Sequence, residues 1–131
     1  MDGVIRVLIA DDSPLLREAI RRFVSELAGV EVVGVSRDGV EALALASEVR
    51  PDVVLIDSSM PGVDTLEATR LLKSQTPAPA VVVCAIEDHE DVRQAARSAG
   101  ADALVRKRDL CRQIEGLLAS LGHPGRHCSA H

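Results

Sequence analysis

The sequence predicts an α/β fold built on a parallel sheet. Short runs rich in β-branched residues alternate with longer amphipathic runs, and the alternation repeats about every 25 residues, which is typical of βα units. The chain has 131 residues, of which 47% are hydrophobic and 27% are charged. These values favour one globular domain with its own core over a disordered chain or two domains.

Five short apolar runs are predicted to form the strands. Residues 53–57 are apolar up to their final Asp, which fits a central strand buried on both faces. The other predicted strands are residues 4–10, 31–35, 80–85 and 103–106.

Capping residues mark the ends of the first two predicted helices. Ser13 and Pro14 suit the N-cap and the first turn of the first helix, and Gly29 suits its exit. Asp38 and Glu41 have the spacing of a capping box at the start of the second helix.

Apolar residues at helical spacing predict which helix faces pack on the sheet. The first helix carries the stripe Leu15, Leu16, Ala19, Ile20, Phe23, Val24 and Leu27. The third carries Leu66, Thr69, Leu71 and Leu72. The last, from about residue 109 to 121, carries Leu110, Ile114, Leu117, Leu118 and Leu121. The fourth helix has a stripe of mostly small residues and should pack thinly: Val92, Ala95, Ala96 and Ala99.

Charge and composition exclude several classes of protein. The net charge of −5 opposes binding to nucleic acid or to an anionic membrane surface, and Phe23 as the only aromatic residue cannot build a base-stacking platform. The apolar runs are far shorter than the ~20 residues of a membrane helix.

Cys84, Cys111 and Cys128 show no disulfide or metal spacing, and no signal peptide precedes them, so we expect reduced thiols in a cytoplasmic protein.

Acidic residues end two of the predicted strands. Asp11 and Asp12 follow the first strand, Asp57 ends the third, and Lys107 follows the fifth. The carboxyl ends of parallel strands share one crevice, so these side chains should meet there. Converging carboxylates need a compensating cation, and Mg²⁺ is the divalent cation that suits oxygen ligands.

A carboxylate held beside Mg²⁺ and an ammonium group can attack phosphorus and become an acyl phosphate. Asp57 is the best candidate nucleophile because it stands alone at the end of the central strand, whereas the pair Asp11 and Asp12 suits metal binding. Single acidic residues at strand ends often only cap the next helix. Several acids and a lysine at several strand ends favour a functional site.

Three segments together resemble the receiver domain of two-component response regulators, over about residues 4–121. They are residues 6–14 (RVLIADDSP), 51–62 (PDVVLIDSSMPG) and 100–107 (GADALVRK). The likeness is greatest to receivers that precede a helix-turn-helix DNA-binding module. The resemblance implies a flavodoxin-like, doubly wound sheet of five strands in the order 2-1-3-4-5 with five helices. We expect residues 1–122 to form this receiver domain.

The resemblance also implies roles for individual residues. Asp57 would accept a phosphoryl group from a histidine kinase or phosphotransfer protein, and Lys107 would pair with that group. Asp12 and Asp57 would ligate Mg²⁺ directly, Asp11 mostly through water, and the backbone carbonyl of Ser59 would complete the protein ligands. Such a domain is not an enzyme beyond its own phosphorylation and dephosphorylation. It would signal to a downstream protein or an output domain, with a homodimer possible.

The sequence departs from the family pattern where receivers read out phosphorylation. Receivers usually carry Ser or Thr at the end of the fourth strand, but this position falls on Cys84 or Ala85, and neither supplies a hydroxyl. Leu104 stands where Tyr or Phe is usual, although it would also serve as an ordinary core residue. Thr65 replaces a common Gly and Arg108 a common Pro. We expect phosphorylation, with a weakened or altered switch.

Two other functions remain open. One is a receiver-shaped interaction module that works without phosphorylation. The other is a small phosphohydrolase acting through an aspartyl phosphate, although Ser59 stands where such enzymes typically carry a second Asp.

The last residues, 123–131, show no apolar period and are expected to form a flexible tail. Pro124 and Gly125 interrupt the helix that would align His123, His127 and His131 as a metal stripe.

Overall fold

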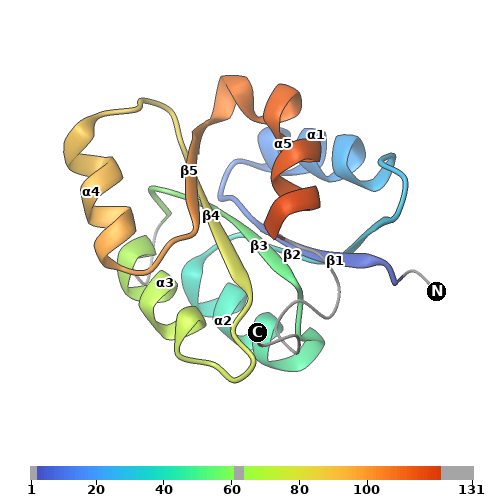
Figure 1. Cartoon of the computed structure of the whole chain (residues 1–131), viewed down its shortest axis with the longest axis horizontal. Coiled ribbons are helices and arrows are strands. Elements are labelled where there is room, and N and C mark those ends of the chain that lie inside the picture. Colours follow the sequence, from blue (N-terminus) through green and yellow to red (C-terminus); the bar gives the residue numbers. More distant parts are fainter. Residues whose placement is uncertain (1–2, 61–63, 122–131) are drawn as a thin grey trace.

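The sheet has the predicted topology. The computed structural model describes residues 3–60 and 64–121, so the predicted tail at 123–131 lies outside the described residues. Five parallel strands follow the order β2-β1-β3-β4-β5 (Figure 1). They are β1 (Ile5–Ala10), β2 (Val30–Ser36), β3 (Val53–Asp57), β4 (Ala80–Ala85) and β5 (Ala103–Arg106). The fold class and the strand order are confirmed.

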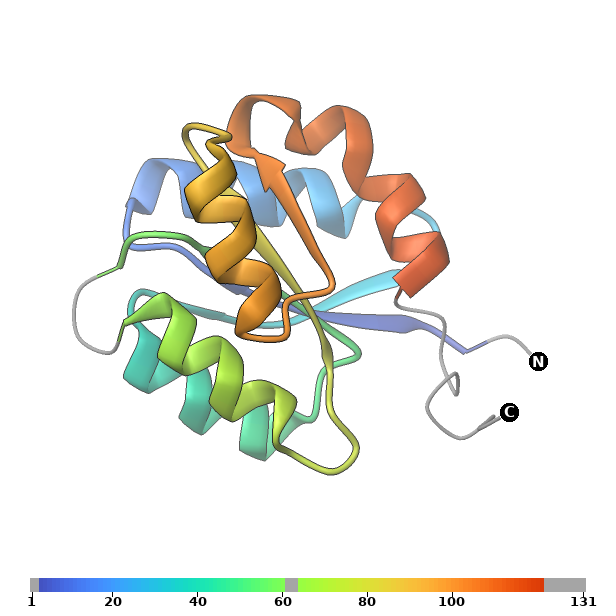
Figure 2. The ribbon, with the colours of Figure 1, turned by 60° about the vertical axis from the view of Figure 1, so that its left-hand side comes forward.

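Helices cover both faces of the sheet (Figure 2). They are α1 (Pro14–Ser25), α2 (Gly39–Val49), α3 (Thr65–Lys73), α4 (Glu90–Ser98) and α5 (Leu110–Leu121), with a short 3-10 turn, η1 (Lys107–Asp109), before α5. Buried residues of α1 and α5 pack on one face, and those of α2, α3 and α4 pack on the other. None of the helices in the described part of the chain combines the length and apolar character that a membrane span requires.

The predicted caps form at the first two helices. The Ser13 hydroxyl accepts a hydrogen bond from the Leu16 N–H, and the Asp38 carboxylate accepts one from the Glu41 N–H at 2.8 Å. The Glu41 carboxylate accepts a hydrogen bond from the N–H of Arg37, not from the N–H of the cap residue Asp38. Gly29 lies beyond the end of α1, in the turn into β2, where its φ of +75° favours glycine.

The predicted stripe of α1 is wrong in the first half of the helix. Leu15 is 80% exposed and Leu16 and Ala19 are also exposed, whereas Ile20 and Val24 are buried. At 3.6 residues per turn, Leu15 lies about 180° and Ala19 about 140° around the helix axis from Val24, so neither shares the inward face.

The predicted stripe of α3 is displaced around the helix. The buried residues are Thr65, Ala68, Thr69 and Leu72, whose spacing defines the inward face. Leu71 lies at the margin of that face and is exposed.

The fourth helix packs thinly, as predicted. Of its residues, all of which are described, only Ala96 is buried. Val92 and Ala95 are half-buried.

Candidate functional site

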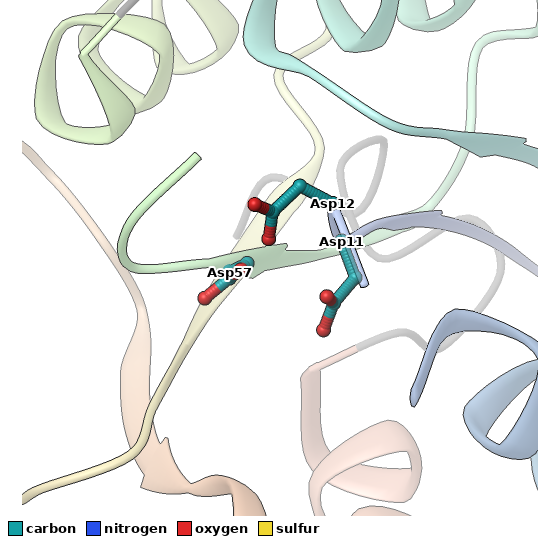
Figure 3. A group of neighbouring side chains, drawn as sticks. All are labelled: Asp11, Asp12 and Asp57. Atoms are coloured by element: carbon teal, nitrogen blue, oxygen red, sulfur yellow. The ribbon is translucent and has the colours of Figure 1, made fainter. Parts of the chain in front are cut away.

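Three carboxylates meet at the carboxyl edge of the sheet. Chain order places Asp11 and Asp12 directly after β1 and Asp57 at the end of β3, and these two strands are neighbours. One carboxylate oxygen from each residue lies within 4.8 Å of the others (Figure 3). Asp11 and Asp57 are buried, at 2% and 3% exposure, while Asp12 is exposed.

Lys107 enters this cluster from the end of β5. Its Nζ lies 3.0 Å from Oδ2 of Asp11 and 3.1 Å from Oδ1 of Asp57, and its side chain is 11% exposed. The structure therefore brings together the four side chains that the sequence analysis selected for the metal and phosphoryl chemistry.

Burial sets the ionisation of the cluster. Burial raises the pKa of Asp57, and the hydrogen bonds from Lys107 and from the Ser59 N–H only partly oppose this effect. Burial alone would lower the pKa of Lys107, but its hydrogen bonds to Asp11 and Asp57, together with the negative charges of these two carboxylates, outweigh burial and raise the pKa. The ammonium therefore stays charged. One ammonium group does not balance the three carboxylates of the cluster.

The donor set fits Mg²⁺. Carboxylate oxygens are the hard ligands that this ion prefers, and the raised pKa of Asp57 indicates that a further cation would be stabilised there. Ser59, the predicted backbone ligand, lies beside the cluster, because its N–H donates to Oδ1 of Asp57 at 3.3 Å.

Backbone contacts fix the residues that carry the carboxylates. The Ser13 N–H donates to Oδ1 of Asp11 at 2.9 Å, and the Arg17 guanidinium donates to the Asp11 carbonyl at 2.9 Å. Arg17 was not among the site residues predicted from the sequence. Its spacing from Asp11, within the first turn of the helix that follows, is a signal that could have suggested one.

The Thr65 hydroxyl makes a contact that the sequence analysis missed. It donates to the Asp57 carbonyl at 2.8 Å. The only sequence signal is a hydroxyl residue where receivers commonly have Gly.

The end of β4 places one small side chain, that of Cys84, beside Asp57. Cys84 pairs with Asp57 in the sheet register, and its thiol contacts the Val82 carbonyl within the core on the α1 and α5 side. Burial raises the pKa of the Cys84 thiol to about 12, so it stays protonated and unreactive near neutral pH. Ala85 is the last residue of β4 and is also buried.

Leu104 is half-buried and packs against the core on the α2, α3 and α4 side. This placement supports its interpretation as an ordinary core residue.

The raised pKa of Asp57 predicts a pH dependence of stability in metal-free solution. A buried carboxylate with a raised pKa destabilises the folded state above that pKa, and the penalty disappears once the pH falls below the ordinary value of 3.8. With EDTA present, Asp57→Asn should therefore be more stable than the wild type at pH 7, and this advantage should disappear below pH 3.8. Urea unfolding at several pH values measures the difference. A wild type as stable as the variant at pH 7 would contradict the prediction.

Comparisons with known proteins agree on one family. Residues 7–116 match the family described as the response regulator receiver domain. The chain is 46% identical over 104 residues to protein-glutamate methylesterase/protein-glutamine glutaminase 5 of Myxococcus xanthus, covering 79% of this chain and 30% of that protein. It is 46% identical over 86 residues to the response regulator GacA of Pseudomonas aeruginosa, covering 65% of this chain and 40% of that protein. The chain thus spans less than half the length of these relatives.

Solved structures show the same likeness. The signal receiver domain of a Mycobacterium tuberculosis protein described as the response regulator NarL superposes with a TM-score of 0.83 at 31% identity, covering 91% of this chain and 97% of that one. A two-component response regulator of the LuxR family from Aurantimonas sp. SI85-9A1 superposes with a TM-score of 0.79 at 30% identity, covering 90% of this chain and 87% of that one, in line with the expected likeness, although the relatives by sequence also include methylesterases. On the family match, these similarities and the shared fold, this chain belongs to the response regulator receiver domain family.

Proposed function

We propose that Asp57 accepts a phosphoryl group from the phosphohistidine of a histidine kinase or phosphotransfer protein. The observation that carries this proposal is the contact of the Lys107 ammonium with two buried carboxylates, Asp11 and Asp57, in a cluster that also includes Asp12. Asp11, Asp12, Asp57 and the Ser59 carbonyl would hold Mg²⁺ there. We place the receiver domain at residues 1–122 and the tail at 123–131.

In this reaction the phosphoryl group passes directly from the histidine nitrogen to the Asp57 carboxylate. A carboxylate oxygen of Asp57 forms the new O–P bond while the P–N bond of the phosphohistidine breaks, and the electron pair returns to the imidazole nitrogen. Lys107 lies within reach of Asp57 and supplies a fixed positive charge for the transferred phosphoryl oxygens. When bound, Mg²⁺ would neutralise the remaining charge on those oxygens.

The surface beside the cluster supports the approach of a protein donor. A hollow of about 430 Å³ is lined by Leu16, Ile86, Glu87, Arg106, Lys107 and Arg108. Leu16 and Ile86 are exposed apolar residues at its rim. Because Lys107 lines this hollow and also contacts Asp57, a protein donor seated in the hollow would lie beside the proposed phosphoacceptor. We place these encounters in the cytoplasm, and we propose that the output is a contact with a downstream protein or an output domain.

A second function is favoured by the end of β4. We assign the usual hydroxyl position to Cys84, because it pairs with Asp57 in the register of β3 and β4 and its thiol feels the charges of Lys107, Asp11 and Asp57. A thiol is only a weak donor and this one already contacts the Val82 carbonyl, so phosphorylation would propagate weakly. This observation supports an interaction module whose contacts depend little on phosphorylation.

Intact-mass analysis after incubation with acetyl phosphate and Mg²⁺ tests the proposal. The wild type should gain the mass of one phosphoryl group, and Asp57→Asn or the addition of EDTA should abolish the gain. Asp64→Asn is the matched control, because it removes the same charge from an exposed helix cap and should still be phosphorylated.

Other outcomes identify the rival functions. A wild type that gains no mass contradicts the proposal and favours the phosphorylation-independent module. Steady turnover of a phosphate ester that Asp57→Asn abolishes would instead indicate a phosphohydrolase.

A further inference from the structure

Thr65 holds the backbone of the proposed phosphoacceptor. It is the first residue of α3, it is buried at 2% exposure, and its hydroxyl donates to the Asp57 carbonyl at 2.8 Å. The hydrogen bond joins the start of α3 to the end of β3, eight positions earlier in the sequence.

The peptide group between Asp57 and Ser58 is fixed on both sides. Its carbonyl accepts from the Thr65 hydroxyl, and its N–H donates to the Cys84 carbonyl of β4 at 2.9 Å. A peptide group held at both polar ends cannot rotate without breaking a buried hydrogen bond. The next N–H along the chain, that of Ser59, contacts Oδ1 of Asp57 itself.

We propose that Thr65 is a positioning residue for Asp57 and for the Ser59 backbone. The proposal rests on the proposed function of Asp57, and it names how this chain fixes that site without the glycine that receivers commonly have there. Loss of the hydroxyl would free the Asp57 carbonyl, let the peptide group rock, and move the carboxylate and the Ser59 carbonyl away from the geometry that transfer and metal binding need.

Thr69 provides a matched control within the same helix. Its side chain is also fully buried, and its hydroxyl also donates a 2.8 Å hydrogen bond to a backbone carbonyl. That carbonyl belongs to Thr65, one turn earlier in α3, so the bond stays within the helix and does not reach β3. Thr69→Val therefore removes a comparable buried bond without releasing Asp57.

The experiment compares Thr65→Val, Thr65→Ser and Thr69→Val with the wild type. Two quantities are measured, namely the rate of phosphorylation by acetyl phosphate and the Mg²⁺ affinity of the unphosphorylated protein, the latter from amide shifts of Ser58 and Ser59. Thr65→Val should slow phosphorylation by about tenfold and weaken Mg²⁺ binding by at least about threefold, since small misplacements of reacting groups are costly. Thr65→Ser should restore both within about twofold because it keeps the donor, and Thr69→Val should match the wild type.

Two outcomes would overturn the proposal. The first is a wild-type phosphorylation rate and Mg²⁺ affinity in Thr65→Val. The second is an equal defect in Thr69→Val, which would indicate general loosening of α3. If Thr65→Val fails to fold, Thr65→Ala removes the hydroxyl without placing a methyl group against the carbonyl and is held to the same expectations. If the wild type itself is not phosphorylated, the proposed function fails, while the Mg²⁺ titration still decides whether Thr65 positions the site.

Discussion

Replacing Lys107 with Met is expected to slow phosphorylation of Asp57 by about 10²–10³-fold, the usual cost of removing one fixed donor from a charge-stabilising site. The side chain keeps its length but loses the ammonium that contacts Asp11 and Asp57. With that charge gone, the phosphoryl oxygens lose a positive neighbour during transfer. The two buried carboxylates also face each other without compensation.

Lys107→Met should also lower the free energy of unfolding. Removing one partner of a buried ion pair typically costs about 3–5 kcal/mol, so Lys107→Met should lose stability of this order in EDTA. Added Mg²⁺ should recover much of the loss, because a bound cation supplies the missing charge and stabilises the folded state by mass action.

Two measurements check the prediction. The intact mass, followed over time in saturating Mg²⁺, gives the rate of phosphorylation. Urea unfolding with and without Mg²⁺ gives the free energy of unfolding. Arg22→Met is the control, since it removes one positive charge from an exposed residue of α1 that does not line the hollow beside the cluster. Equal rates for Lys107→Met and the wild type would show that the ammonium serves only the packing of the cluster.

The convergence of the candidate site was predictable from sequence because it follows from topology. In a parallel sheet all carboxyl ends lie at one edge, so acids after β1 and β3 and a lysine after β5 must approach one another once the strand order is known. The strands themselves were found because buried parallel strands are nearly unbroken apolar runs.

Other features depend on tertiary geometry that periodicity does not contain. The choice between Cys84 and Ala85 could not be made from sequence, since both are small, buried residues at a strand end. The hydrogen bond from Thr65 to the Asp57 carbonyl joins the start of α3 to the end of β3, a tertiary contact that no local pattern encodes.

The predicted stripe of α1 was too wide, whereas that of α5 followed one face of its helix. At 3.6 residues per turn, Leu15 lies about 180° around the helix axis from the buried Val24. Leu15 belongs to the predicted stripe of α1 and is 80% exposed, whereas Ile114 belongs to the predicted stripe of α5 and is fully buried.

Ile114→Ala and Leu15→Ala should therefore differ strongly in stability. Ile114 packs in the core between α5 and the sheet, so its truncation should lower the free energy of unfolding by about 2–5 kcal/mol through lost burial and a cavity. That is a large share of the ~5–15 kcal/mol typical of a domain. Leu15→Ala should change it by less than about 0.5 kcal/mol, because the side chain gives up little buried surface.

Urea unfolding followed by far-ultraviolet circular dichroism suits this chain, which has no Trp or Tyr to report by fluorescence. Both variants keep all the residues of the acidic cluster, so phosphorylation of the folded fraction should stay at the wild-type level in each. A comparable loss of stability at Leu15 would mean that this side chain is buried by a contact on the outward face of α1. A loss confined to Ile114 would instead show that only the face turned to the sheet contributes to the core.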